Sequence, residues 1–421
     1  MSYKNIYILG VGGSGMSSIA KYLKQKGDNV IGYDQRKSYV TNLLNQDGIK
    51  VVHTLDEITY KPESLYIYSS AIPIESDRFE DFYDKENVLS RPEYLKNLSE
   101  NQKIIGITGT HGKTSTTALL SHIFHFNNVN VSYLYGGITT FNGIGGHYGD
   151  PDQPLILETD EAFNTFEKIK ISDLLVLNVD SDHLDYFKNL DNYKDAFYKV
   201  MKNVTDNLVI NNDDLNIKSM KELKNPVSYG KDIAADFKVQ SPGTFIYENN
   251  KYEIKSDIIG DHFKSNMLGA VILALLNGIE IEDSLNAIES FAGVKRRIEL
   301  IGISKGVLIY DDYGHHPTEM EATITALKQQ TESKLYVVFQ PHRYTRTMEY
   351  FNSFKDSLKL ADFAIVTDIY PAGESPIPGI SSKNFEEESI KYLKSIRYVP
   401  EYLSKKVQNG DIVLTLGAGD I

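Results

Sequence analysis

The chain has 421 residues, a formal net charge of −13 and no cysteine. This length is too great for one core, so we expect two or three domains. The acidic balance argues against a nucleic-acid surface, which needs a basic footprint. The lack of cysteine excludes disulfides, thiolate catalysis and Cys-ligated metal centres. Because no apolar run approaches a membrane span and glycines interrupt the first one, we expect a cytoplasmic protein without a signal peptide or membrane insertion.

Strand and helix signals alternate along the whole chain, which predicts an α/β fold with parallel sheets. We expect three domains, at residues 1–98, 99–293 and 294–421, with a polar linker at 97–102. An antiparallel hairpin is expected within 237–254, turning near 248–250. In the last domain, strands are expected at 307–310, 335–339, 363–366 and 412–415.

The first glycine-rich loop, residues 10–15, fits G-x-G-x-x-G between a strand signal and a helix signal. Asp34 ends the next strand signal, so the pattern alone allows a nicotinamide-dependent oxidoreductase with Asp34 on a ribose hydroxyl. Any diphosphate loop of this fold could carry the same pattern. We favour a UDP-sugar here, because a second phosphate loop follows and a dehydrogenase would leave it unused.

The second loop, Gly109-x-x-Gly112-Lys113-Thr114, lies between the apolar run 103–107 and a helix signal. Glycines let backbone amides approach a polyphosphate, Lys113 supplies charge to the β/γ-phosphates, and the Thr114 hydroxyl can join a Mg²⁺ shell. The spacing is shorter than that of the usual loop. ATP is therefore the expected nucleotide, and a non-catalytic nucleotide-binding switch is the alternative use.

Several motifs, in this order along essentially the whole chain, resemble those of the Mur ligases: residues 10–16, 69–72, 91–93, 109–114, 182–185, 294–297, 311–319, 340–346 and 416–420. Runs 311–317 and 340–346 resemble the branch that adds the first amino acid. The resemblance implies a Rossmann-like UDP-substrate domain, a P-loop ATPase-like central domain and a Rossmann-like C-terminal domain. It also implies ATP- and Mg²⁺-dependent joining of L-alanine to the carboxylate of UDP-N-acetylmuramate through an acyl phosphate, in peptidoglycan synthesis. A murein-peptide recycling ligase of the same family is the nearest alternative, and a monomer or homodimer is expected.

The resemblance also assigns residues to roles. The implied ATP-binding residues are Gly109, Thr110, His111, Gly112, Lys113, Thr114, Ser115, Asn266, Arg297, Asp312 and His316. The implied UDP-substrate residues are Gly12, Gly13, Ser14, Gly15, Met16, His53, Ser70, Ala71, Arg91 and Glu93. The implied metal ligands are Thr114, Glu158 and His183, and the implied catalytic residues are Lys113, Glu158, His183, His342, Arg343 and Arg346.

In the last domain the histidines at 315, 316 and 342 and the arginines at 343 and 346 form an expected cationic cluster for the muramyl carboxylate and the transferred phosphate. Residues 370–374 resemble the segment facing the incoming amino acid. Two stretches depart from the family pattern: Ala162 and Phe163 replace polar positions, and Phe263 cannot hydrogen-bond a base, so only Asn266 and His262 are carried over there. Lys194 and Lys199 are expected to be helix-surface charges.

Overall fold

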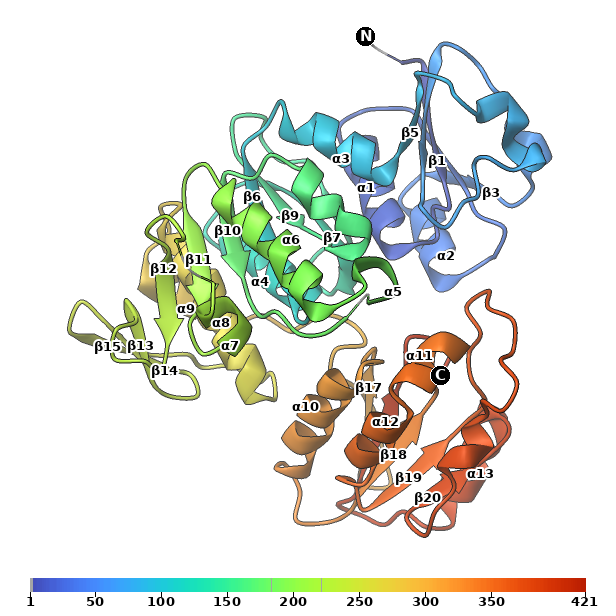
Figure 1. The fold of residues 1–421 in the computed structure, drawn as a ribbon, viewed down its shortest axis with the longest axis vertical. Helices are drawn as coiled ribbons and strands as arrows, with labels where there is room; N and C mark the ends of the chain where they lie inside the picture. The colour runs from blue at the N-terminus through green and yellow to red at the C-terminus, as the bar shows by residue number, and fades with distance from the viewer. Residues whose placement is uncertain (1–2, 183, 221) are drawn as a thin grey trace. The chain divides into compact units, whose positions relative to one another are not determined.

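The computed structural model describes residues 3–182, 184–220 and 222–421 and confirms the α/β prediction. The chain divides into two compact units (Figure 1). The first unit comprises Met1–Ser256 with Lys264–Ala292, and the second comprises Asp257–Phe263 with Gly293–Ile421. The first unit contains two sheets and the second contains one. The three predicted domains thus correspond to three sheets, while their limits at 98/99 and 293/294 remain predictions.

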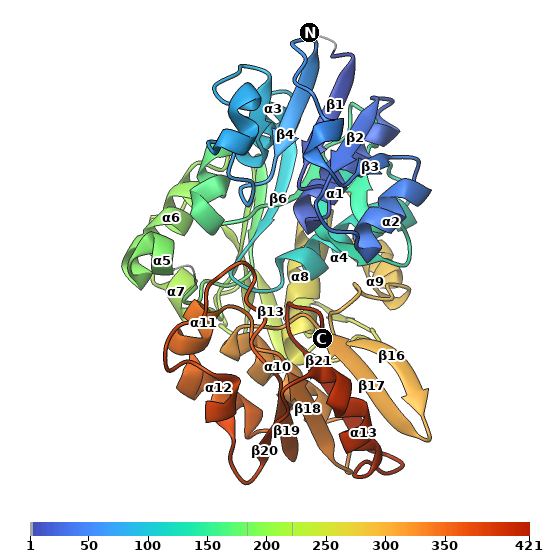
Figure 2. The same cartoon turned by 90° about the vertical axis from the view of Figure 1, so that its right-hand side faces the viewer.

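The N-terminal sheet is wholly parallel, in the order β3-β2-β1-β4-β5 (Figure 2). Its elements are β1 (Asn5–Leu9), α1 (Ser14–Gln25), β2 (Val30–Tyr33), α2 (Tyr39–Gln46), β3 (Lys50–Val52), β4 (Ser64–Tyr68), β5 (Val88–Ser90) and α3 (Arg91–Ser99). The strand order reverses between β1 and β4, so the glycine loop after β1 lies at a topological switch point, where ligands of such sheets bind. The linker prediction is wrong over residues 97–99, because a Ser90–Glu93 capping box starts a helix that continues to Ser99.

The central sheet has the order β15-β14-β13-β12-β11-β10-β6-β9-β7-β8. Its strands are β6 (Ile104–Thr108), β7 (Ser132–Thr139), β8 (Gly143–His147), β9 (Leu155–Glu158), β10 (Asp173–Val176), β11 (Leu208–Asn211), β12 (Val227–Gly230), β13 (Phe237–Ser241), β14 (Thr244–Tyr247) and β15 (Asn250–Glu253). Its helices are α4 (Lys113–Phe126), α5 (Leu184–Phe187), α6 (Leu190–Lys202), α7 (Leu215–Lys218), α8 (Asp261–Leu275) and α9 (Ile281–Glu289). β14 and β15 pair antiparallel from Tyr247 and Asn250 outward, which confirms the hairpin prediction.

The two sheets of the first unit are joined by helix α1, which packs against β7 and β8. A Cβ atom on Gly146 would lie 2.0 Å from the Ser18 carbonyl oxygen, so only glycine allows this approach. Lys21 is 7% exposed, and its ammonium donates to the carbonyls of Asn142 in the β7–β8 turn and of Ile144 in β8. Burial lowers the pKa of Lys21, although Asp47 opposes the shift. The joint therefore combines close backbone packing with hydrogen bonds from a buried cation.

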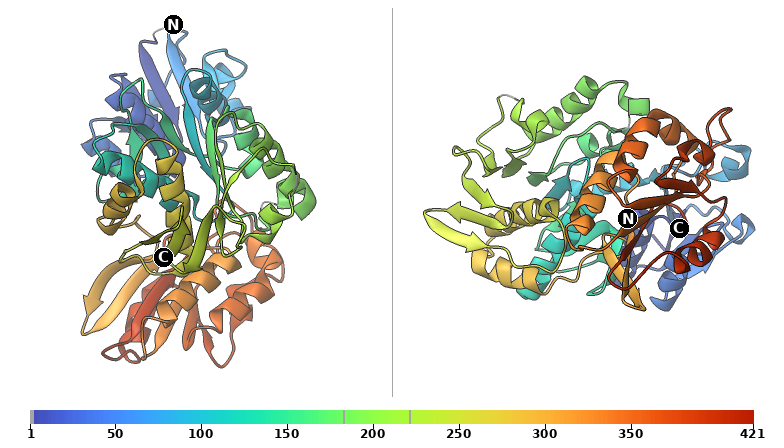
Figure 3. Two further views of the ribbon diagram at one scale, coloured as in Figure 1. Left: turned by 90° about the vertical axis from the view of Figure 1, so that its left-hand side faces the viewer. Right: turned by 90° about the horizontal axis from the view of Figure 1, so that it is seen from below.

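The sheet of the second unit has the order β16-β17-β21-β18-β19-β20, parallel except for the β16–β17 pair (Figure 3, orange to red). Its elements are β16 (Glu299–Ser304), β17 (Val307–Asp312), α10 (Pro317–Lys328), β18 (Leu335–Phe339), α11 (Tyr344–Glu349), α12 (Phe351–Leu358), β19 (Phe363–Val366), β20 (Ile390–Tyr392), α13 (Val399–Ser404) and β21 (Ile412–Leu416). These bounds confirm the four strands predicted there. Short 3₁₀ helices lie at Leu55–Glu57, Asp77–Phe82, Ala162–Lys168, Ser382–Phe385 and Ile396–Tyr398.

Among the helices of the described residues, none combines the length and the apolar character needed to cross a bilayer.

We expect Gly146→Ala to destabilise the first unit by about 2 kcal/mol, because the added methyl meets a backbone carbonyl that cannot rotate away. Urea denaturation followed by circular dichroism measures the change. Gly302→Ala in β16 is the control, since a Cβ there meets no atom within 4 Å. Equal stability of the two variants would contradict the close packing of α1 on β8.

Candidate functional site

The second glycine loop has the geometry of an anion-binding turn between β6 and α4. Gly109 and Gly112 have φ of +144° and +85°, which side-chain-bearing residues rarely adopt. Gly112 immediately precedes the first residue of α4, so the first-turn amides of this helix face the loop. A Cβ on Gly112 would lie 2.4 Å from the Asn266 amide nitrogen, which places that buried amide against the loop.

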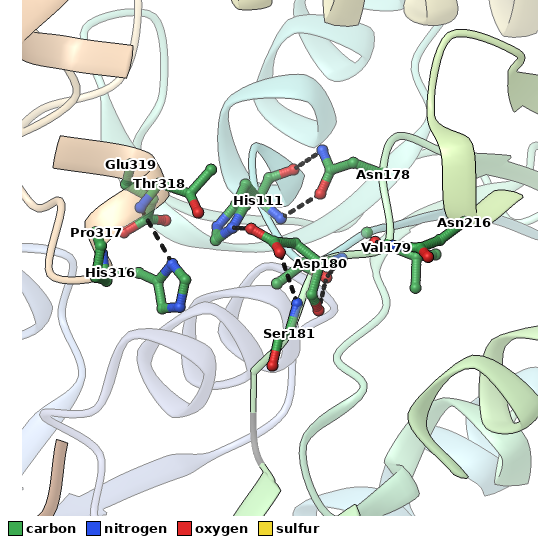
Figure 4. Close-up of polar contacts among 12 residues, drawn as sticks. His111, Asn178, Val179, Asp180, Ser181, Asn216, His316, Pro317, Thr318 and Glu319 are labelled. Carbon is green, nitrogen blue, oxygen red and sulfur yellow. Dashed lines mark hydrogen bonds and ion pairs between the residues drawn. The ribbon is translucent and has the colours of Figure 1, made fainter. Parts of the chain in front are cut away.

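The loop is held from the neighbouring strand by Asn178, which follows β10 (Figure 4). The His111 amide donates to the Asn178 side-chain oxygen at 2.8 Å, and the Asn178 amide donates back to the His111 carbonyl at 2.9 Å. The His111 ring lies 3.2 Å from the Asp180 carboxylate. The Thr110 hydroxyl both accepts from the Asp180 amide and donates to its carbonyl. This network fixes the loop backbone before any phosphate binds.

Lys113 is the first residue of α4, and its side chain forms an ion pair with Glu161. Its ammonium donates to the Glu161 carboxylate at 2.9 Å and to the carbonyls of Gly109 and Thr110 at 2.6 and 3.0 Å. Glu161 is 1% exposed and also accepts from the Tyr193 hydroxyl at 3.3 Å. Burial favours the neutral amine, but the carboxylates of Glu161, Asp160 and Glu158 outweigh it and raise the pKa of Lys113. Lys113 is therefore a cation at neutral pH.

Thr114 and Glu158 form a pair of oxygen donors beside Lys113. The Thr114 hydroxyl donates to one Glu158 oxygen at 2.7 Å, and the Gly136 amide donates to the other at 2.6 Å. A hydroxyl and a carboxylate at the carboxyl end of a strand are hard ligands of the kind that Mg²⁺ prefers. This donor set fits the predicted magnesium ion. His183, the third predicted ligand, lies outside the described residues.

In the N-terminal domain the first glycine loop is closed by Asp34. One carboxylate oxygen accepts from the Gly12 amide at 2.9 Å, and the other accepts from the Arg36 amide at 3.0 Å. The His53 ring contacts the Asp34 carbonyl at 2.7 Å. A dehydrogenase would use the Asp34 carboxylate to bind a ribose hydroxyl. Here both oxygens of this carboxylate already accept hydrogen bonds from backbone amides of the protein.

The other predicted UDP-substrate residues lie around the same loop. Gly13 precedes α1, and Ser14, Gly15 and Met16 form its first turn. The Arg91 guanidinium lies against Gly15 and faces the Asp160 carboxylate at 3.9 Å. Ser70 and Ala71 are exposed after β4. Glu93 accepts from the Ser90 amide at 2.7 Å, which gives it a helix-capping role as well.

In the second unit, Asp312 ends β17 and is 4% exposed. Its carboxylate accepts from the amides of Ile298 and Gly314 at 2.8 and 2.7 Å. Burial raises the pKa of Asp312 to about 6, although Arg297 and both amides oppose the shift. Beside it, the guanidinium of Arg297 lies over the Tyr313 ring and 3.9 Å from Glu319.

Two histidines of this unit, His315 and His342, lie close to Arg346. The rings of His315 and His342 are 5.9 Å apart, and His342 stacks on Tyr370. Burial and the charge of Arg346 lower the pKa of both rings to about 4, with Glu319 opposing the shift at His315 and Glu374 at His342. His316 instead caps α10, because its ring nitrogen accepts from the Thr318 amide at 3.4 Å (Figure 4).

Arg343 follows His342 with a φ of +71°, and its amide donates to the Tyr370 carbonyl at 2.8 Å. Its guanidinium donates to Glu374 at 2.6 Å, and the amide and hydroxyl of Thr345 donate to the same carboxylate. The predicted segment 370–374 is therefore tied to Arg343 by both backbone and side chain.

Family models match nearly the whole chain. The first is described as "Mur ligase family, catalytic domain" and matches residues 5–103, the "Mur ligase middle domain" matches 107–274, and "Mur ligase, glutamate ligase domain" matches 296–419. The chain belongs to the Mur ligase family.

Relatives from this family align end to end with the chain. The UDP-N-acetylmuramate--L-alanine ligase of Dictyoglomus turgidum is 35% identical over 100% of the chain and 95% of its own length. That of Caldicellulosiruptor saccharolyticus is 36% identical, with 99% and 96% covered. A UDP-N-acetylmuramate-alanine ligase from Thermotoga maritima has a TM-score of 0.82 at 24% identity, with 99% and 96% covered. A murein peptide ligase from Psychrobacter arcticus has a TM-score of 0.71 at 21% identity over the same shares, and both structures support the fold.

The structure brings the central-domain residues predicted for a Mur ligase site into contact, but their roles remain predictions. Lys113, Thr114, Ser115 and Glu158 gather around the loop, with Asn266 behind it. Arg297, Asp312, His316, His342, Arg343 and Arg346 lie in the second unit. Sequence reasoning missed four residues of the central network: Asn178, Asp180, Glu161 and Tyr193. The only available signal was a polar residue after the apolar run 173–177.

The predicted cationic cluster needs a correction. His315 and His342 are neutral at pH 7, because burial beside Arg346 disfavours a further positive charge. Positive charge in this part of the Mur ligase therefore comes from the arginines, and Arg343 is already paired with Glu374. The two histidines can offer hydrogen bonds but contribute no charge.

We expect the second unit to lose stability in acid partly through His342. The folded pKa is about 4, below the ordinary value of about 6.5, so the unfolded chain binds the proton first as pH falls. Stability present above pH ~6.5 is then lost progressively toward pH ~4, with a slope below about 1.4 kcal/mol per pH unit because the ring is partly solvated.

His342→Gln should flatten this acid branch, which denaturation midpoints between pH 7 and 4.5 would measure. His53→Gln, in the first unit, is the control. An identical pH dependence of wild type and His342→Gln would contradict a buried neutral imidazole.

Proposed function

We propose that this Mur ligase joins L-alanine to the lactyl carboxylate of UDP-N-acetylmuramate at the expense of ATP, in the synthesis of peptidoglycan precursors. The observation that carries the proposal is the full-length similarity to UDP-N-acetylmuramate--L-alanine ligases, with Thr114 hydrogen-bonded to Glu158 and Lys113 next to Thr114 at the start of α4. A carboxylate is a poor acyl donor, so it is first converted to an acyl phosphate. Because the reaction uses a UDP-linked substrate and ATP, we expect it to take place in the cytoplasm.

In the first step a carboxylate oxygen bonds to the γ-phosphorus of ATP and the bond to ADP breaks. In the second, the amine nitrogen bonds to the carbonyl carbon and phosphate leaves with the former carboxylate oxygen. Two anions meet in the first step, so the protein must offset their repulsion. Lys113 provides a buried cation for the phosphates, and the helix amides that follow Gly112 provide oriented dipoles.

Thr114 and Glu158 would hold the magnesium ion, which when bound supplies positive charge to the phosphates. Gly136 and Thr114 fix both Glu158 oxygens, so this ligand needs little reorganisation. In the second unit, Asp312, Arg297 and His316 are assigned to ATP. Arg346 and the neutral rings of His315 and His342 are assigned to the substrate carboxylate and the amino acid, with Arg343 acting through Glu374.

The direct test is mass spectrometry of the products formed from UDP-N-acetylmuramate, ATP, Mg²⁺ and an equimolar amino-acid mixture. We expect the L-alanine adduct to dominate, with weak glycine and L-serine adducts, because one methyl group is discriminated by only ~1–3 kcal/mol. A product formed only from a free tripeptide would make the protein a recycling ligase. No product with either acceptor would reject both assignments.

Glu158→Gln should raise the Mg²⁺ concentration for half-maximal activity at least about tenfold, because a neutral amide is a poorer ligand for a hard cation. Phosphate release during a magnesium titration measures the effect. Glu282→Gln, at an exposed position in the first turn of α9, is the matched control for loss of one carboxylate in the chain. A magnesium requirement unchanged by Glu158→Gln would remove Glu158 from the metal site.

A further inference from the structure

The strongest unassigned feature is that every hydrogen-bond donor of the Lys113 ammonium already has an acceptor within the protein. An ammonium has three N–H donors. All three are used within the protein, on the Gly109 carbonyl at 2.6 Å, the Thr110 carbonyl at 3.0 Å and the Glu161 carboxylate at 2.9 Å. Lys113 therefore cannot donate to a phosphate until at least one of these bonds breaks.

Glu161 differs from the other two acceptors in charge and in position. It lies on the segment between β9 and the 3₁₀ helix Ala162–Lys168, whereas both carbonyls belong to the loop that leads into the helix of Lys113. A carboxylate and a phosphate on one ammonium would repel each other. An incoming triphosphate therefore competes most directly with Glu161.

The surroundings of Glu161 keep the carboxylate in place when the lysine leaves. The Tyr193 hydroxyl contacts the same oxygen at 3.3 Å and the Thr110 hydroxyl at 3.0 Å. The second oxygen of Glu161 is buried and has no hydrogen-bond partner among the described residues. No step of the reaction described above uses this carboxylate.

We propose that Glu161 is a positioning residue that holds Lys113 in the nucleotide-free enzyme and is exchanged for the phosphates when ATP binds. The carboxylate occupies the ammonium in place of an anionic ligand, so ATP binding includes the free-energy cost of breaking a buried ion pair. The exchange lowers affinity for ATP and keeps Lys113 charged and ordered in its absence. This inference rests on the proposed function, because it requires ATP at the loop.

Calorimetric titration of the full-length protein with ATP, without Mg²⁺ or the other substrates, tests the exchange. We expect Glu161→Gln to tighten ATP binding about tenfold, because a neutral amide holds the ammonium less strongly. Glu161→Asp keeps the charge but shortens the side chain by one methylene, so it should also tighten binding, by about threefold or more. Glu167→Gln removes the same charge at an exposed position on the adjacent 3₁₀ helix and should leave the Kd within about twofold of wild type.

The Glu161→Asp variant keeps the negative charge but moves it away from the Lys113 ammonium. Tighter ATP binding by this variant would therefore come from the lost contact with Lys113 and not from a lost negative charge. Circular dichroism identifies variants that are folded, and Glu161→Asp keeps the test open if Glu161→Gln does not fold. Unchanged or weaker ATP binding by a folded Glu161 variant would overturn the proposal. Failure of the wild type to bind ATP even with Mg²⁺ present would instead reject the proposed function.

A crystal structure of the wild type with a non-hydrolysable ATP analogue gives a second readout. We expect the Lys113 ammonium to lie on the phosphates and more than about 4 Å from Glu161, beyond the range of an ion pair. An intact Lys113–Glu161 contact with the analogue bound would overturn the exchange. A merely structural Glu161 would keep its lysine in both states.

Discussion

The parallel alignment of β9, β6 and β10 governs the chemistry of the central domain. Ile107 pairs with Glu158, and Thr108 pairs with Val176, so the carboxyl ends of these strands lie level at one edge of the sheet. Whatever follows each strand is brought to the same place. The glycine loop before α4, the Thr114–Glu158 pair and the residues that brace the loop all depend on this register. A shift of one residue in the β6–β9 pairing would turn Glu158 to the opposite face.

Local sequence pattern could predict the glycine turn between β6 and α4, because its glycines and Lys113 lie within a few residues of one another and the turn follows from backbone conformation. The bracing residues could not be predicted in the same way. Asn178 contacts the loop across 67 residues, Glu161 meets Lys113 across 48, and Tyr193 meets Thr110 across 83. Such contacts are set by strand order and by side-chain packing, and no spacing in the chain encodes them.

The second unit shows a different limit of sequence reasoning. Its predicted strands formed as expected because buried parallel strands are continuous apolar runs. The charge of its polar cluster did not follow from residue types, because a histidine changes its protonation with its surroundings. His315 and His342 are neutral here, and Arg343 is neutralised by Glu374. The net charge of this polar cluster depends on how deeply each side chain is buried. The amino-acid composition alone does not reveal this burial.

The joint between α1 and the β7–β8 turn has a consequence for how the protein can be divided. A fragment beginning after α3 would lose Lys21 and expose the carbonyls of Asn142 and Ile144 that it satisfies. It would also uncover the face of β8 against which Ser18 packs. The central domain is therefore not an independent module despite its own sheet and its own family model. Fragments for crystallography or ligand screening therefore need to retain the N-terminal domain.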